Sequence, residues 1–224
     1  MKLIESLQRP DDHNSLANRF RRNRARRIRR LIETISAEKG HCRIVDLGGM
    51  PEYWGLFDHD FLVAAKVTVT LVNTFPLAVE DDLFATVEAD ACALDRMPDR
   101  SFDLVHSNSV VEHVGDWARM EAFARETRRL APRYYVQTPY FWFPIEPHFS
   151  SLFFHWRSEQ WRARALMRQA RGFAERASDM GAAMRDIQSA RLLDKTQFGF
   201  LFPDAQHFDE QAAGLTKSLI AVRA

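Results

Sequence analysis

Apolar positions follow two different periodicities along this chain. From Phe20 to Ile35 they recur at roughly helical spacing around the eight arginines of Arg19–Arg30, which predicts an amphipathic helix that stops at Lys39-Gly40. Short apolar runs, several rich in β-branched residues, then predict five strands: CRIVDLGG (42–49), KVTVTLVN (66–73), FATVEADA (84–91), FDLVHSNS (102–109) and RYYVQTP (133–139). The change of period after residue 40 therefore predicts a helix followed by a sheet.

Helical patterns separate these strands. A short, interrupted one covers residues 51–65 and a longer one covers 111–130, and beyond the fifth strand residues 161–187 and 196–202 also have helical spacing. Two final strands are predicted near AQHFDEQ and TKSLIAVRA. Strands that alternate with helical crossovers favour an α/β, doubly wound, mostly parallel sheet covered on both faces. We expect a single domain over residues 1–224, with a basic helical segment at 1–40 and an aromatic, helical insertion at 140–190 that forms a substrate lid.

Composition narrows the protein class. The chain has 224 residues, 46% of them hydrophobic, and a net charge of +1, which excludes disordered, collagen-like and disulfide-stapled proteins. The two cysteines, Cys42 and Cys92, lack metal-type spacing. No signal-peptide pattern opens the sequence, and no apolar run reaches the roughly 18 residues of a membrane span. We therefore expect a cytoplasmic protein.

Charge is distributed unevenly. Residues 1–40 hold 11 basic and 5 acidic side chains, whereas residues 41–130 hold 8 and 16. The Arg19–Arg30 helix is interpreted either as a solvated helix over a sheet edge or as a contact for an anionic partner, such as an anionic membrane surface. The acidic middle third argues against a broad nucleic-acid footprint. The oligomeric state cannot be read from the sequence.

Polar residues follow the predicted strands. Ligands of doubly wound sheets bind outside the carboxyl ends of the strands, where Asp46 with Gly48-Gly49, Asn73 and Asp90 are expected. Glycines permit close approach of a ligand to the backbone, the Asn73 amide can bond vicinal hydroxyls, and Asp90 can accept from an exocyclic amine. The pattern is typical of a site for an ammonium, a ribose and an adenine.

The ordered segments IVDLGG, VTLVN, VEADA and SFDLVHSNSVVEHV resemble successive motifs of the class I S-adenosylmethionine-dependent methyltransferases. DLGGMPEYW, FPIEPHF and GLTKSLIAV are similar to a type 11-like bacterial subgroup associated with surface-glycan assembly. The resemblance implies a Rossmann-like, seven-stranded sheet with an antiparallel last strand and a helical insertion between strands five and six. It also implies S-adenosylmethionine as cofactor, and methyl transfer to an oxygen or nitrogen of a small-molecule, sugar or lipid-linked acceptor.

The same resemblance implies roles for individual residues. Asp46, Gly48 and Gly49 form the loop at the methionine part, Asn73 faces the ribose, Asp90 and the Ala91 amide face adenine, and Ser107 and Asn108 lie beside the sulfonium. Two features depart from the family. Met50 and Glu52 replace the second and third loop glycines, and Asn73 replaces the usual acidic ribose ligand.

Acceptor chemistry is expected beyond the fifth strand. A sulfonium is already an activated methyl donor, so a base is needed only when the acceptor is protonated. We expect His148 to be that base, with Glu146 orienting it between two stiffening prolines, and His113 to be a second candidate. Alternatively, the aromatics are core and Glu146 and His148 cap the next helix. Tyr140 and Trp142 are expected to contact the acceptor, since aromatic faces suit sugar stacking, although they also suit a membrane-touching edge.

Glu112 and His113 are also candidate metal ligands. Some members of the resembling family hold a metal there with an acid-x-x-acid-His cluster, but Ser109 stands where the first acid belongs. We therefore expect no metal, and we expect Glu112 to cap the helix that follows. Two rival functions stay open: a non-catalytic cofactor-binding or scaffold protein with a degenerate glycine loop, and a nicotinamide-dependent oxidoreductase, although Gly-x-Gly-x-x-Gly is missing after the first strand.

Overall fold

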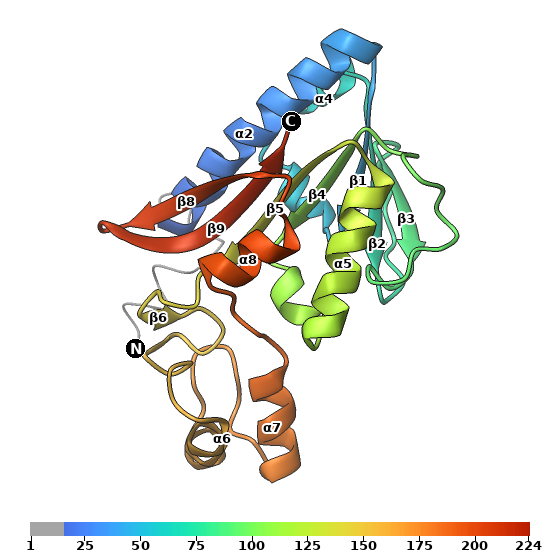
Figure 1. Ribbon diagram of the computed structural model, residues 1–224. Coiled ribbons are helices and arrows are strands. Elements are labelled where there is room, and N and C mark those ends of the chain that lie inside the picture. Colours follow the sequence, from blue (N-terminus) through green and yellow to red (C-terminus); the bar gives the residue numbers. More distant parts are fainter. Residues whose placement is uncertain (1–15) are drawn as a thin grey trace.

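The protein is built around a seven-stranded sheet (Figure 1). The computed structural model describes residues 16–224, with side chains from residue 19; residues 1–15 of the basic N-terminal segment lie outside the described residues. The strand order is β3-β2-β1-β4-β5-β9-β8. The strands are β1 (Cys42–Leu47), β2 (Val67–Asn73), β3 (Phe84–Glu88), β4 (Leu104–Asn108), β5 (Arg133–Pro139), β8 (Gln206–Ala212) and β9 (Leu215–Arg223). β1 to β5 pair in parallel, while β9 runs antiparallel to both β5 and β8, so the predicted α/β, Rossmann-like sheet with an antiparallel last strand is confirmed.

Parallel register brings the polar strand ends to one edge. Leu47 at the end of β1 pairs with Val72, one residue before Asn73 at the end of β2. At the other side of β1, Asn108 at the end of β4 pairs with Gln137 of β5. The residues that follow these strands therefore meet over the same edge of the sheet.

Helices cover both faces of the sheet (Figure 1). On one face, α2 (Leu16–Lys39) buries Ile28, Ile32 and Ile35, and α4 (His59–Ala64) packs beside it on β2. On the other face, α5 (Trp117–Leu130) and α8 (Lys195–Leu201) bury Phe123 and Phe198. No helix within residues 16–224 combines the length and the apolar character needed to cross a membrane.

The segment between β5 and α8 forms a separate lobe with a small core of its own (Figure 1). It contains a hairpin of β6 (Ile145–Glu146) and β7 (Ser151–Leu152), which the sequence pattern did not predict. Helices α6 (Glu159–Arg168) and α7 (Met180–Gln188) confirm helical structure within residues 161–187, as two helices rather than one.

The predicted helix over residues 111–130 is divided. Val111–His113 form a single 3₁₀ turn, η1, and α5 starts only at Trp117. Gly115 adopts a φ of 121°, which breaks the helix, and the Asp116 carboxylate then caps α5 by accepting from the Arg119 amide. The prediction that Glu112 caps this helix is wrong, because Asp116 occupies that position.

Asp103 fastens the end of α2 to the sheet. Its side chain is fully buried, and its oxygens accept from Lys39 Nζ at 2.6 Å and from the Arg43 amide at 2.8 Å. Burial alone would raise the pKa of the Asp103 carboxyl, but these hydrogen bonds outweigh burial and hold the pKa below its ordinary value.

We expect Asp103→Asn to destabilise the protein by about 2 kcal/mol at pH 7, the scale of hydrogen bonds to a charged group. Since the folded-state pKa is depressed, the contribution is present above the unfolded value of about 3.9 and is lost as pH falls through the folded value. Urea unfolding of both proteins at pH 7 and at decreasing acid pH measures this difference. A difference that does not change with pH would contradict the charge-based explanation.

Candidate functional site

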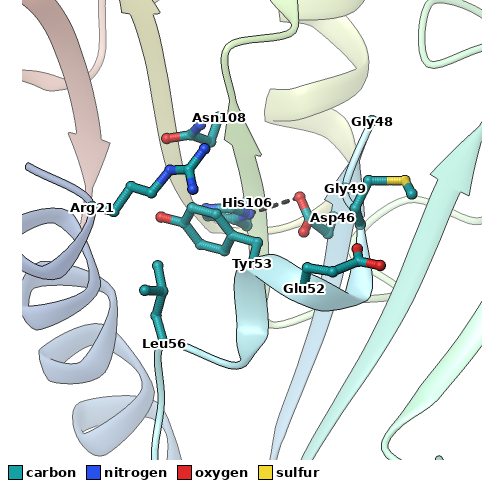
Figure 2. A pocket seen from close by; sticks show the side chains of 10 residues that line it. Arg21, Asp46, Gly48, Gly49, Glu52, Tyr53, Leu56, His106 and Asn108 are labelled. Atoms are coloured by element: carbon teal, nitrogen blue, oxygen red, sulfur yellow. Dashed lines mark hydrogen bonds and ion pairs between the residues drawn. The ribbon is translucent and has the colours of Figure 1, made fainter. Parts of the chain in front are cut away.

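Two cavities lie at the carboxyl ends of β1, β2 and β4, and Gly48 lines both. The first, of about 330 Å³, is lined by the predicted residues Asn73, Asp90 and Ala91. The second, of about 260 Å³, is lined by predicted and unpredicted residues: Asp46, Gly49, Asn108, Tyr53, His106 and Arg21 (Figure 2). Ser107 lines neither, because its buried hydroxyl donates to the Leu47 carbonyl at 3.1 Å.

The glycine loop fits only residues without a side chain. A Cβ on Gly49 would lie 2.0 Å from Asp46 Oδ2, and one on Gly48, which has a φ of 71°, would lie 2.6 Å from Val110. The buried Asp46 carboxylate supports the loop and is held by Trp54 Nε1 at 2.9 Å, from α3 (Pro51–Trp54). Met50 and Glu52, which replace family glycines, line the second cavity without closing it.

His106 is a buried neighbour of this loop. Its Nδ1 donates to Asp46 Oδ1 at 2.7 Å, since a carboxylate can only accept, and its ring lies 4.7 Å from Tyr53 between centroids (Figure 2). Among the described residues, His106 Nε2 and the Tyr53 hydroxyl have no hydrogen-bond partner. Burial raises the pKa of Tyr53 above its ordinary value, so the hydroxyl stays protonated. Both residues line the second cavity, and each has a buried polar atom without a partner beside it.

Asn73 connects the loop to the first cavity. Its Nδ2 donates to the Gly49 carbonyl at 2.8 Å. The side-chain oxygen is the part of this amide that can accept from a ligand hydroxyl. Asn73 therefore serves the loop, a role that an ionised aspartate could not fill because it has no donor.

Asp90 lines the first cavity together with Arg119 of α5, which the sequence pattern did not single out. Arg119 Nη2 donates to both Asp90 oxygens, at 2.8 and 2.6 Å, and the Cys92 amide donates at 2.9 Å. Burial would raise the pKa of the Asp90 carboxyl, but these bonds hold it below its ordinary value. The carboxylate is therefore ionised and fixed in place at neutral pH.

Arg24 extends the arginine helix into the site. Its side chain is buried, and it donates to Glu210 Oε1 at 3.0 Å, to Asn108 Oδ1 at 2.7 Å and to Gln137 Oε1 at 3.0 Å. The sequence holds a signal for it: Arg24 lies four residues from both Phe20 and Ile28, on the apolar face of the helix.

Other arginines of α2 also contact the protein. Arg27 lies over the Phe208 ring at 4.1 Å, and Arg29 lies over Phe61 at 3.9 Å. Neither interpretation of the arginine run, a solvated helix or a contact for an anion, includes these intramolecular contacts.

A third cavity of about 130 Å³ lies beyond β5. Arg24, Tyr140 and Lys217 line it, so Tyr140, a predicted acceptor contact, borders a cavity. Burial lowers the pKa of Lys217 to about 8, and the nearby Arg24 charge adds to this. Trp142 is not among the residues that line this cavity: it is 55% exposed and meets Phe141 edge-on.

The three predicted catalytic residues, Glu146, His148 and His113, come together beside the third cavity. His148 Nδ1 donates to Glu146 Oε1 at 2.7 Å, and His148 Nε2 lies 3.1 Å from His113 Nε2. Burial disfavours a charged His148 ring, but the Glu146 hydrogen bond and charge outweigh it and raise the pKa of His148. The alternative that Glu146 and His148 cap the following helix is wrong, because Ser158 caps α6.

Part of the chain matches a known protein family. Residues 62–133, which are 72 of the 224 residues, match a family described as "Methyltransferase domain". A search of curated proteins gives no significant match.

Solved structures with similar folds are distant. The 1,6-didemethyltoxoflavin-N1-methyltransferase of Burkholderia thailandensis, solved with S-adenosylhomocysteine, is 12% identical (TM-score 0.46, covering 87% of this chain and 76% of that one). An arsenic(III) S-adenosylmethionine methyltransferase of Chlamydomonas reinhardtii is 19% identical (TM-score 0.45, covering 81% of this chain and 62% of that one). A SAM-dependent methyltransferase of Methanosarcina mazei is 14% identical (TM-score 0.47, covering 81% of this chain and 91% of that one). Because these TM-scores are below 0.5, the fold is assigned from the strand order and strand register of this chain itself. The family match supports the methyltransferase resemblance over the segment that holds β2, β3, β4 and α5.

Proposed function

We propose that this protein transfers a methyl group from S-adenosylmethionine to an oxygen or nitrogen of a small-molecule, sugar or lipid-linked acceptor. The observation that carries the proposal is the pair of cavities that meet at Gly48, with Asn73 and Asp90 on one side and the Asp46-supported loop on the other. The methyltransferase-domain match over residues 62–133 is independent support.

The residues around these cavities fit the cofactor. Asp90 and the Ala91 amide would face adenine, and the Asn73 side-chain oxygen would accept from a ribose hydroxyl. In the second cavity the Arg21 guanidinium would complement the cofactor carboxylate, and the unsatisfied Tyr53 hydroxyl and His106 Nε2 would gain polar partners. The missing Cβ atoms of Gly48 and Gly49 leave room for the Val110 and Asp46 side chains, and both glycines line the second cavity, where the methionine part would lie.

When bound, S-adenosylmethionine supplies a methyl group that its sulfonium has already activated. The chain must then hold the acceptor atom in line and exclude water. The insertion at 140–190 is suited to this task, and we propose that Tyr140 and Trp142 contact the acceptor. Trp142, Trp156 and Phe153 form a continuous exposed aromatic surface that suits a sugar ring, with centroids 5.9 and 4.8 Å apart. His148 or His113 would accept the proton of the acceptor, and Glu146 would orient His148.

Isothermal titration of the purified protein with S-adenosylhomocysteine tests the cofactor assignment without an acceptor. We expect one site with a dissociation constant on the order of 10 µM, and no binding of NADH. No heat and no thermal shift at millimolar ligand would favour a non-catalytic scaffold instead.

Asn73→Asp is a sharper test, because it restores the acid that is usual in the resembling family. We expect it to weaken S-adenosylhomocysteine binding about tenfold, or 1.4 kcal/mol, since an ionised aspartate cannot donate to the Gly49 carbonyl and instead faces its oxygen. Titration calorimetry of the wild type, Asn73→Asp and Asn73→Ala measures the effect. Tighter binding by Asn73→Asp would show that Asn73 acts on the ribose alone.

A further inference from the structure

Four polar side chains from two segments converge at the edge of the first cavity. Glu112 and His113 lie in η1 after β4, whereas Glu146 and His148 come from the hairpin of the insertion. One ligand atom from each of Glu112, His113 and His148 lies within 4.8 Å of the others. His113 also lines the first cavity.

Hydrogen bonds fix the tautomer of both histidines. His113 Nδ1 lies 2.8 Å from the Ser189 carbonyl oxygen, which can only accept, so Nδ1 carries the proton. His148 Nδ1 lies 2.7 Å from Glu146 Oε1, and the other oxygen of this carboxylate accepts from the Phe149 amide at 2.5 Å. In neutral rings, each Nε2 is therefore a bare lone pair.

These lone pairs face each other, and a carboxylate stands beside them. The two Nε2 atoms are 3.1 Å apart, an arrangement that needs a proton or a cation between them. Glu112 is 1% exposed; its Oε2 accepts from Thr138, while Oε1 has no partner among the described residues. A single proton shared by the histidines would leave this buried oxygen unsatisfied.

We propose that Glu112, His113 and His148 form a binding site for a first-row divalent cation such as Zn²⁺. With metal–nitrogen bonds of about 2.0–2.1 Å, nitrogens 3.1 Å apart subtend about 100° at the ion, close to a tetrahedral angle. Two imidazoles and one carboxylate suit Zn²⁺ and its neighbours, whereas Mg²⁺ prefers oxygen ligands. Ser189, Glu146 and Thr138 supply the outer hydrogen bonds that orient metal ligands.

The proposed site differs from the expectation of no metal. The sequence offered Ser109 in place of an acid, but the insertion supplies His148 as the third ligand. Three protein ligands leave one position open. Resting on the proposed function, we infer that this position takes an acceptor oxygen, whose proton is then released to solvent more readily. With the ion bound, His113 and His148 are ligands, and the ion takes over the base role proposed for them above.

Titration calorimetry of chelator-treated protein with Zn²⁺, and visible absorption with Co²⁺, test the site. We expect one ion per chain, a tetrahedral Co²⁺ spectrum and no Mg²⁺ heat at millimolar concentration. His148→Ala should weaken Zn²⁺ binding at least 30-fold, and Glu146→Gln about tenfold through the outer hydrogen bond. The exposed His59 supplies the matched control, so His59→Ala should bind Zn²⁺ like the wild type.

S-Adenosylhomocysteine binding separates the outcomes. His148 is not among the residues that line either cofactor cavity, so His148→Ala should still bind S-adenosylhomocysteine, which shows that the variant is folded. Zn²⁺ binding that survives both His148→Ala and His113→Ala, or the absence of stoichiometric binding to the wild type, would overturn the metal site. Zn²⁺ binding without S-adenosylhomocysteine binding would uphold the metal site and overturn the proposed function.

Discussion

Gly49→Ala is expected to weaken S-adenosylhomocysteine binding more than 100-fold. The added Cβ would lie 2.0 Å from Asp46 Oδ2 and 2.1 Å from its carboxyl carbon, a separation that no rotation of the new methyl relieves. Either the loop moves into the second cavity, or the Asp46 carboxylate leaves Trp54 and His106. Hydrogen bonds to a charged group are worth about 1.5–3 kcal/mol each, so two of them exceed the roughly 2.7 kcal/mol that corresponds to 100-fold.

Gly55→Ala is the matched control in the same loop. Gly55 has an ordinary helical φ of −63°, and a Cβ there would contact only the Glu52 carbonyl oxygen at 3.4 Å. We expect its binding, measured by titration calorimetry, to stay within about threefold of the wild type, less than 1 kcal/mol. If Gly49→Ala binds as tightly as Gly55→Ala, the Asp46-supported loop is not the cofactor cradle.

Arg24→Met is expected to lower stability by about 3–5 kcal/mol, the usual effect of removing one member of a buried ion pair. Methionine keeps much of the side-chain volume but leaves the buried Glu210 carboxylate without its closest cation. The Asn108 oxygen loses its Arg24 donor, and Gln137 Oε1 keeps only the Ser109 hydroxyl of its two donors among the described residues. The remaining cation, Lys217, lies 3.6 Å from Glu210. For a chain of this size, we expect thermal unfolding to shift by about 10 °C.

Two further variants identify the cause. Arg22 is exposed on the same helix, so Arg22→Met should change stability by less than about 0.5 kcal/mol. Adding Glu210→Gln to Arg24→Met should recover part of the loss, because the uncompensated buried charge is then removed. An Arg24→Met protein as stable as Arg22→Met would show that the network contributes no net stability.

Much of the sheet could be predicted because each strand carries its own local signal. The β-branched run of Val67–Asn73 and the apolar run of Cys42–Leu47 fix two strands, and their parallel pairing follows from the helical crossover between them. The break in the helix before α5 was not predicted, because Val114 and Trp117 fit a helical period. Only Gly115 and Asp116 mark the break.

The site was harder to predict where its parts come from distant segments. The glycine loop, Asn73 and Asp90 could be placed because strand ends in a parallel sheet share one edge. The contact between His113 and His148 depends on how the insertion folds back, and no periodicity encodes that path. Local sequence patterns specify helices and strands, while polar pairs between distant segments depend on tertiary packing.

Arg24 and Glu210 are 186 residues apart, which orders events during synthesis. While the ribosome is still making the central strands, Arg24 of α2 lacks its Glu210 partner, so the helix that carries Arg21 to the second cavity is not yet held by this ion pair. Only once β8 has left the exit tunnel can the helix settle. The nascent chain would therefore acquire this ion pair, and the fixed position of α2 over the sheet, only after Glu210 has been synthesised.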